Sequence, residues 1–479
     1  MKNLIFLIAI ASLLFSYSAV AQEVEVVGQG THPKQKKYHN FIGYGNGNEV
    51  RNDHRILAVF KEGELIKKVK LSTQHKQRRF IGAEDYIYYF YIEGNPKREG
   101  AIAYMEKRDF DFNLVGQRVQ VMDLHASKGV AFRIDYKAFK VEYNKKFNRF
   151  LVSFVVQKED EDNSYIKASL VDTGGNTLNS FAYAVNEGKI LELNDSGFRI
   201  LENGDAMVAF VIFDSADSYK RVVIGIAVVY IPGDGSDLVA LPVEPELEQM
   251  TEVGITSFID KDGNVYYAVL SSKQKDDNSI LTLYKFNVKN QEYTKNNYKI
   301  KLKDYLKFPM YQGFYLNEVY TDENNVKYVD LTIGSSKQRH LILKLDEKDN
   351  LVWISALEKL GYDHPNAMSS DGDLSFIDNE GDLVYIFNSP INRVKEGVYY
   401  PVDGSMLNTL KAGGFITLKA RFDQYSGEVT YEHLKIDGKE TVDLVIGEAQ
   451  ETDQNGVYKV QLKLGENKKD FKVAVIDFN

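Results

Sequence analysis

Short runs of β-branched and aromatic residues recur along the chain, each bounded by Gly, Asn or Asp. Residues 255–300 show the pattern most clearly, because polar turns separate "ITSFIDK", "VYYAVLSS", "ILTLYKFN" and "QEYTKNNYKI". Runs of this length and composition predict β-strands, and the turn residues between them predict antiparallel hairpins. This segment is therefore expected to form one sheet of four strands.

The same unit repeats with a nearly constant period. Its second strand is expected to begin at seven positions, which are Tyr86, Arg149, Ala206, Val265, Val326, Leu383 and Val457. Five of the six spacings lie near 60 residues, and the last is longer because residues 390–414 are inserted between two strands. A fixed period of four-stranded units predicts a β-propeller.

The seventh unit has only three strands before the chain ends, which would leave an exposed sheet edge. An N-terminal segment, "RILAVF" or "ELIKKVKL", is expected to pair there. The fold prediction is an all-β propeller of seven four-stranded blades, closed by an N-terminal strand, in a single domain over residues 22–479. Two β-sandwich domains are the alternative, which the even period disfavours.

The first residues carry a basic start, an apolar run and small residues ending at Ala21. This order is typical of a cleavable signal peptide over residues 1–21, and it predicts export to the periplasm or the extracellular space. No second apolar run of about 20 residues follows, so no membrane span is predicted.

The composition narrows the possible chemistry. The chain has no cysteine, which excludes disulfides, thiol nucleophiles and cysteine metal sites. Its net charge is −9, with acidic and basic residues interspersed, so a nucleic-acid partner is not expected.

Three segments, "DKDGNVYY", "NEGDLVYIF" and "DNLVWISAL", resemble secreted β-propeller-like repeat proteins of unknown function from Gram-negative bacteria. The resemblance implies the same repeat fold but no enzyme signature. A fold of this kind hosts many functions, so the resemblance does not assign one.

The first turn of several units is acidic, and "DKDGN" places Asp260, Asp262 and Asn264 at alternate positions around Gly263. Calcium loops use such spacing, but they need six to eight oxygens, and the distal Glu is missing here. Asp-Gly and Gly-Asn dipeptides also suit tight hairpins without any ion. A structural turn is favoured, and calcium is the only cofactor considered.

The longer connections of a propeller blade leave from one face, where binding residues are usually carried on loops. The candidate ligand-binding residues in these connections are His125, Tyr311, Tyr362, Asp363, His364, Arg393, Tyr399, Tyr400 and Asp403. Such a mixture suits a protein, peptide or glycan ligand.

No serine-hydrolase elbow, HExxH zinc motif or phosphate loop occurs in the chain. The favoured function is therefore an exported, non-catalytic propeller that binds an envelope or extracellular partner through its loop face. The alternatives are a carbohydrate-active or lactone-cleaving enzyme with carboxylates in the channel, and a purely structural part of a surface assembly.

Overall fold

The computed structural model describes most of the chain between residues 24 and 478. The segments outside the description are 32–39, 54, 62–63, 84, 96–99, 124–131, 134–138, 159–163, 186–189, 215–221, 244–251, 261, 273–277, 289, 291, 302–303, 306–313, 334–338, 359–372, 391–393, 396–397, 400–414, 435–442, 453–455 and 465–469. The predicted signal peptide also lies outside it. None of the described segments forms a helix with the length and hydrophobicity of a membrane span.

The described elements are all β-strands, and they form two compact units. The unit Pro33–Leu357 holds six consecutive sheets. The first sheet consists of β2 (Asn40–Gly45), β3 (Asn48–Asp53), β4 (Ile56–Lys61) and β5 (Glu64–Lys70). The second consists of β6 (Lys76–Gly82), β7 (Ile87–Asn95), β8 (Gly100–Arg108) and β9 (Val119–Asp123). The third consists of β11 (Phe139–Asn144), β12 (Arg149–Lys158), β13 (Ser164–Asp172) and β14 (Thr177–Val185), and β10 (Phe132–Arg133) also pairs with β12. The next three consist of β15 (Ile190–Ile200), β16 (Ala206–Phe213), β17 (Val223–Ile231) and β18 (Val239–Leu241); β19 (Glu252–Ile259), β20 (Val265–Ser272), β21 (Asn278–Asn287) and β22 (Glu292–Lys301); and β23 (Phe314–Thr321), β24 (Lys327–Ile333), β25 (Arg339–Leu345) and β26 (Leu351–Glu358).

The second unit comprises Met1–His32 and Glu358–Asn479 and holds two sheets and a short hairpin. Its elements are β27 (Asp373–Ile377), β28 (Leu383–Pro390), β31 (Phe415–Phe422) and β32 (Val429–His433); β33 (Asp443–Glu451), β34 (Val457–Leu464), β35 (Asp470–Asp477) and β1 (Val24–Thr31); and the hairpin of β29 (Val394–Lys395) and β30 (Val398–Tyr399).

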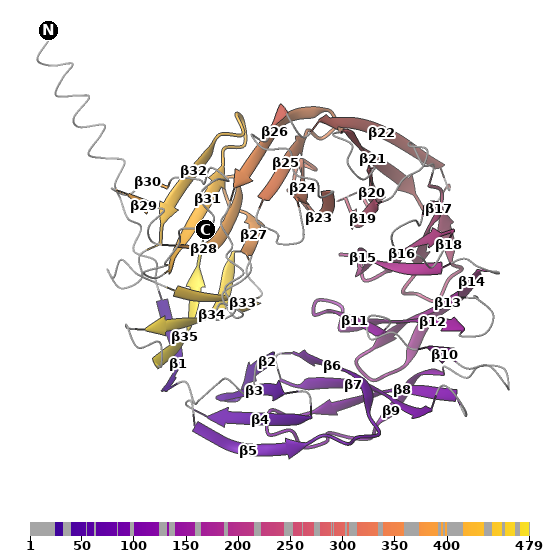
Figure 1. Cartoon of the computed structure of the whole chain (residues 1–479), viewed down its shortest axis with the longest axis vertical. Coiled ribbons are helices and arrows are strands. Elements are labelled where there is room, and N and C mark those ends of the chain that lie inside the picture. The colour runs from indigo at the N-terminus through magenta and orange to yellow at the C-terminus, as the bar shows by residue number, and fades with distance from the viewer. Residues whose placement is uncertain are drawn as a thin grey trace, which may run out of the picture. The chain divides into compact units, whose positions relative to one another are not determined.

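The six sheets of the larger unit are antiparallel meanders that follow one another along an arc (Figure 1). Their first strands β2, β6, β11, β15, β19 and β23, called the inner strands below, lie on the inner side of the arc, each beside the next. This arrangement of four-stranded meanders confirms the predicted all-β propeller fold.

Hydrophobic side chains between consecutive sheets form the core of this unit. In β16, Met207, Ala209 and Val211 pack against the sheet β19–β22, whereas Val208 and Phe210 pack against the sheet β11–β14. Because successive strand residues point to opposite faces, a strand covered on both faces needs an uninterrupted apolar run. Burial on both faces therefore explains the apolar runs that the sequence shows at its second strands.

All seven predicted second strands are confirmed within one residue, as β7, β12, β16, β20, β24, β28 and β34. The count of seven blades is wrong, because the described residues form eight sheets of four or more strands. The extra sheet is β2–β5, whose second strand "NEVRND" lacks an apolar run. Glu49 and Arg51 are buried in it and form an ion pair with each other.

An N-terminal strand does complete the last sheet, but neither predicted segment supplies it. "RILAVF" forms β4, which pairs with β3 and β5, and "ELIKKVKL" forms β5. Both segments are thus used within their own sheet. The completing strand is β1, which lies antiparallel to β35 from Val24 opposite Ile476 to Thr31 opposite Asp470.

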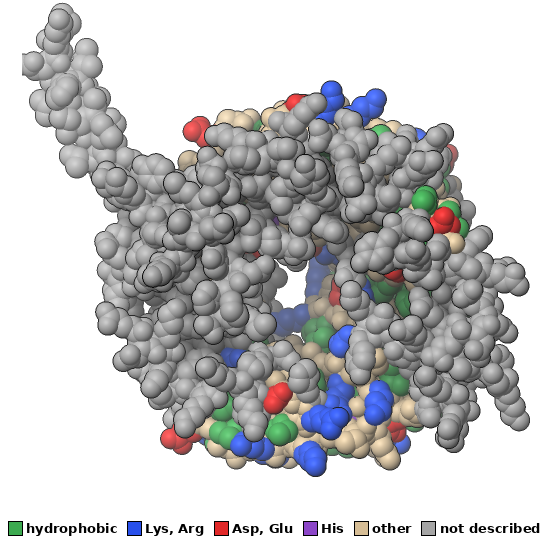
Figure 2. Space-filling model, viewed as in Figure 1, with side chains coloured by type: hydrophobic (Ala, Val, Ile, Leu, Met, Phe, Trp, Pro, Cys, Tyr) green, Lys and Arg blue, Asp and Glu red, His purple; other side chains and the backbone are tan. Residues whose placement is uncertain are grey.

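The outermost strands expose their free edges. Lys67, Lys68 and Lys70 lie in the edge strand β5, which pairs only with β4, and Figure 2 shows Lys and Arg side chains gathered over the sheets β2–β5 and β6–β9. Lysines on an edge strand disfavour pairing with a strand of another chain.

Candidate functional site

The nine predicted ligand-binding residues lie in four connections between described strands. Eight of them lie outside the described residues: His125 between β9 and β10, Tyr311 between β22 and β23, Tyr362, Asp363 and His364 between β26 and β27, and Arg393, Tyr400 and Asp403 between β28 and β31. The ninth, Tyr399, belongs to β30, of which only the backbone is described. In an antiparallel meander the second and fourth strands end at the same edge. The four connections therefore leave their sheets at equivalent edges, called the loop edge below.

The turn at Asp260 lies at the opposite, hairpin edge, between β19 and β20. The Asp260 carboxylate is buried, and its Oδ1 accepts hydrogen bonds from the backbone N–H groups of Asp262 (3.0 Å) and Asn264 (2.8 Å). Asn264 Nδ2 donates to Asp260 Oδ2 at 2.9 Å, and Lys285 Nζ lies 3.6 Å from the same oxygen. Gly263 has a φ of 79°, which favours glycine. Hydrogen bonds of the turn itself thus engage both oxygens of Asp260.

Three other hairpins use the same five-residue arrangement, in which Asp at the first position accepts from the backbone and side-chain nitrogens of Asn at the fifth. They are Asp109–Asn113, Asp172–Asn176 and Asp346–Asn350. Recurrence with identical donors and acceptors indicates a structural turn, because the side chain satisfies backbone N–H groups that the hairpin leaves unpaired. Calcium at Asp260, Asp262 and Asn264 stays the untested alternative to the structural turn.

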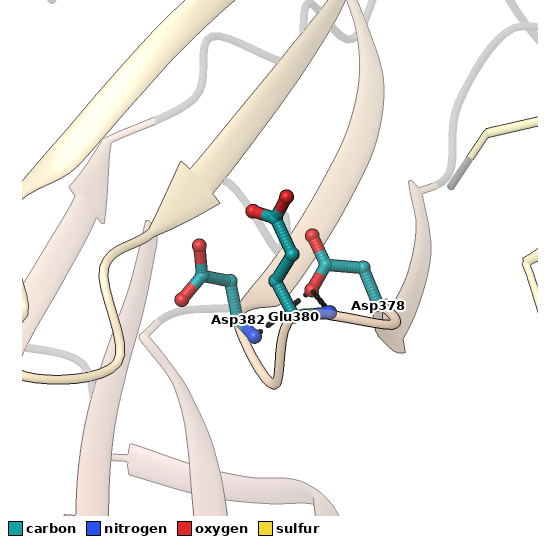
Figure 3. Close-up of side chains that lie close together, drawn as sticks. All are labelled: Asp378, Glu380 and Asp382. Carbon is teal, nitrogen blue, oxygen red and sulfur yellow. Dashed lines mark hydrogen bonds between the residues drawn. The ribbon is translucent and has the colours of Figure 1, made fainter.

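The turn between β27 and β28 departs from this arrangement. Figure 3 shows Asp378, Glu380 and Asp382 together, with ligand oxygens within 4.8 Å of one another. Asp378 Oδ1 accepts from the backbone N–H groups of Glu380 and Asp382, both at 3.0 Å. Asp382 occupies the fifth position, where Asn stands in the four turns above, and a carboxylate cannot donate to Asp378 Oδ2.

A guanidinium group takes the place of the missing asparagine amide, as an ion-pair partner of Asp378. Arg421 of β31 places Nη2 3.0 Å from Asp378 Oδ2, and its Nη1 lies 2.6 Å from Glu380 Oε2 and 3.8 Å from Asp382 Oδ2. The contact with Asp378 is an ion pair without hydrogen-bond alignment, since Oδ2 accepts no hydrogen bond within the described residues. Arg421 thus offsets one of the three negative charges and lies among the oxygens where a metal cation would bind.

The inner strands carry a second charged cluster. Glu142 comes from β11, Arg199 from β15, Thr256 from β19 and Glu318 from β23, so four consecutive sheets contribute to it. All four residues lie in the halves of their strands that lead to the first hairpin. The cluster therefore lies toward the hairpin edge, away from the loop edge.

Arg199 is the centre of this inner-strand cluster. Its Nη1 and Nη2 donate to the two carboxylate oxygens of Glu318 at 2.5 and 2.9 Å, and Nη1 also contacts Thr256 Oγ1 at 3.2 Å and the Ser257 carbonyl at 3.0 Å. About a quarter of each side chain in the pair is exposed, 26% for Arg199 and 29% for Glu318. The two-point contact fixes the guanidinium across β19 while leaving it accessible.

Glu142 is held beside this pair. Its Oε1 accepts a hydrogen bond from the Ile200 backbone N–H at 2.8 Å. Burial raises the pKa of Glu142 to about 7, opposed by the hydrogen bond from Ile200 and the charge of Arg199, and reinforced by Glu318. The carboxyl can therefore change protonation near neutral pH.

Sequence reasoning missed this cluster, although a signal existed. Arg199 and Thr256 are separated by 57 residues, and Arg199 and Glu318 by 119, which are about one and two repeat periods. Polar residues that recur at the repeat period on first strands would have pointed to the inner strands.

A third polar group, around His75, lies on the sheet β6–β9. The His75 ring stacks on Tyr91 with centroids 3.7 Å apart, its Nδ1 lies 3.0 Å from Tyr89 Oη, and its Nε2 lies 3.1 Å from Glu93 Oε1. Burial lowers the pKa of His75 and raises that of Tyr89. A phenol held neutral is a poor nucleophile, so this group is best explained by packing.

Comparisons with known proteins do not assign a family. No protein-family model and no curated protein matches the chain. Similar solved structures include a protein of unknown function from Dyadobacter fermentans, with 12% identity and a TM-score of 0.35, covering 73% of this chain and 95% of that one. The polysaccharide lyase Uly1 has 8% identity and a TM-score of 0.38, covering 95% and 100%, and prolyl oligopeptidase B from Galerina marginata has 10% and 0.38, covering 84% and 51%. With TM-scores below 0.5, these likenesses carry no argument about function.

Proposed function

We propose that the protein is an exported, non-catalytic β-propeller that binds a protein, peptide or glycan of the envelope or the extracellular space through its loop edge. The observation that carries the proposal is the difference between the turns at the hairpin edge and the connections at the loop edge. The described hairpins turn their Asp and Asn side chains back onto their own backbones, whereas the longer connections leave from the loop edge. Rigid sheets that carry such connections are a common scaffold for binding loops.

Replacement of residues 390–414 by a short Gly-Ser turn tests the proposal. The mature chain, residues 22–479, is labelled and screened on peptide and glycan arrays. The replacement is expected to abolish binding while leaving the melting temperature nearly unchanged, because a short turn can join the paired strands β28 and β31. Tyr425→Ala is the matched control, since this tyrosine is 81% exposed but belongs to the hairpin between β31 and β32.

One result would count against loop-edge binding, and another would change the variant used. Equal binding by the replacement and the intact chain would show that the insertion makes no contact. A collapse of the melting transition would show that residues 390–414 support the fold, and point substitutions Arg393→Ala and Tyr400→Ala would then test binding without removing the segment.

One observation favours an enzyme as the second candidate. Glu142 has a pKa of about 7 and lies in the same cluster as Glu318, on inner strands. A carboxyl group that titrates near neutrality suits general acid catalysis on a glycosidic or lactone substrate. Turnover of polysaccharides or lactones by the mature chain, lost in Glu142→Gln, would support this candidate; no turnover with or without calcium counts against it.

A further inference from the structure

The unused hydrogen-bonding groups of the inner-strand cluster define a possible ligand position. A guanidinium has five N–H donors, and Arg199 directs those of Nη1 and one of Nη2 to Glu318, Thr256 and Ser257. Within the described residues, the Nε–H and the second Nη2–H make no hydrogen bond. These two donors lie along one edge of the planar group and point in parallel, which is the geometry for two-point recognition.

Glu142 supplies a complementary acceptor. Its Oε1 is engaged by the Ile200 N–H, but its Oε2 accepts no hydrogen bond within the described part of the chain. A hydroxyl group can accept from Arg199 and donate to a carboxylate at the same time, whereas an apolar group would leave both unsatisfied.

With Glu142 ionised, above its pKa of about 7, the charges around the cluster balance. Lys140 is two residues before Glu142 in β11 and stabilises its charged form, so the two carboxylates are offset by Arg199 and Lys140. A site with no formal excess charge does not favour an anion over a neutral molecule. Tyr320 lies two residues after Glu318 in β23, on the same face of the strand, and is close enough to interact electrostatically with Arg199.

We infer that the inner-strand cluster of Glu142, Arg199, Thr256 and Glu318 binds an uncharged, hydroxyl-rich ligand, a neutral glycan. Paired hydroxyl groups of a sugar match the parallel N–H donors of Arg199, and the fixed ion pair with Glu318 keeps the guanidinium in place before the ligand arrives. This site lies toward the hairpin edge, so it does not depend on loop-edge binding.

Saturation-transfer NMR with the mature chain tests the inference, with maltohexaose, cellohexaose and chitohexaose as neutral probes and hexagalacturonate as the anionic one. At least one neutral probe is expected to bind, and hexagalacturonate is expected to bind more weakly. Arg199→Lys keeps the charge facing Glu318 but loses the parallel donors, so it should raise the Kd of the neutral probe by about tenfold or more. The matched control is Arg421→Lys, which also removes an arginine from carboxylates but should leave this Kd unchanged.

Three results would overturn the inference. They are the absence of binding by all neutral probes, equal Kd values for Arg199→Lys and the intact chain, and tighter binding of hexagalacturonate. If Arg199→Lys does not fold, Glu142→Gln is measured at pH 8, where it exchanges a carboxylate oxygen for an amide donor while keeping an acceptor for Ile200. The replacement of residues 390–414 should retain binding of the neutral probe, which separates this site from the loop edge.

Discussion

The turns at Asp260–Asn264 and Asp378–Asp382 occupy the same position in their sheets but are neutralised differently. In the first, Asn264 donates to Asp260 and a lysine stays 3.6 Å away. In the second, Asp382 cannot donate and Arg421 contacts the carboxylates directly. Lys285 and Arg421 hold equivalent places in the third strand, opposite Tyr266 and Val384 respectively. Where the fifth turn residue is Asp382 instead of an asparagine, the equivalent place in the third strand thus holds Arg421 instead of a lysine.

Removing the arginine should have the largest effect. Arg421→Ala leaves the Asp378 carboxylate, only 2% exposed, without the cation that contacts it, and we expect the free energy of unfolding in urea to fall by about 2 kcal/mol. Arg421→Lys should lose less, since it keeps the charge. A loss below about 0.5 kcal/mol for the alanine variant, the range of ordinary surface substitutions, would mean that Arg421 does not stabilise this cluster.

Transferring the acidic fifth residue to the other turn should have the next largest effect. Asn264→Asp removes both side-chain donations to Asp260 and adds a like charge, with an expected cost of about 1 to 2 kcal/mol. Lys285→Arg in the same chain should recover part of this cost. Urea unfolding of both single variants and the double variant measures the coupling, and strict additivity would contradict the equivalence of Lys285 and Arg421.

The reverse change should stabilise the turn slightly. Asp382→Asn provides an amide donor for Asp378 Oδ2, keeps an oxygen to accept from the Gln424 N–H, and removes a like charge. We expect a gain of about 0.5 kcal/mol at pH 7. Destabilisation would show that Arg421 needs Asp382 to hold its position.

The same variant should flatten a small pH dependence. Burial, reinforced by the charge of Asp378, raises the pKa of Asp382 above its ordinary value. A carboxyl with a raised folded-state pKa favours the fold at acid pH, and this contribution is lost as the pH rises through the raised pKa. The advantage of Asp382→Asn over the intact chain should therefore grow from pH 3.5 to pH 7, as followed by the urea midpoint.

Calcium should have the smallest effect, none on the melting temperature, because hydrogen bonds of the turn engage Asp260 and Arg421 lies within 4 Å of all three carboxylates of the cluster at Asp378. A ligand at 100 times its Kd would stabilise the fold by about 2.7 kcal/mol, which a melt with EDTA and then millimolar calcium detects. A rise that disappears in the Asp260→Asn, Asp262→Asn double variant would make this turn a metal site.

The sequence predicted those parts of the fold whose strands are covered on both faces. Such strands, like β16 and β20, read as apolar runs at a fixed period, and their starting residues were located within one residue. The sheet β2–β5 was missed because Glu49 and Arg51 satisfy each other inside it. Buried ion pairs remove the apolar signal without removing the strand.

The inner-strand cluster was not predictable from local motifs. Glu142, Arg199 and Glu318 lie on three different sheets, and each appears singly among many charged residues. Only alignment of the repeats brings them to one position. The candidate loop residues, by contrast, were selected from their place in the repeat. The described strands on either side of them give only the sheet edge at which their connections begin.

Because β1 pairs with β35, the last sheet can form only when two segments that lie far apart in the sequence come together. Two of its four strands, β1 and β35, come from residues 24–31 and 470–477, so they cannot meet until both have been synthesised. The entropy cost of closing so long a loop grows only slowly with length, but such distant contacts form slowly. Removal of residues 24–31 therefore leaves β35 without its partner at one edge, and removal of residues 470–477 takes away the strand that pairs with both β1 and β34.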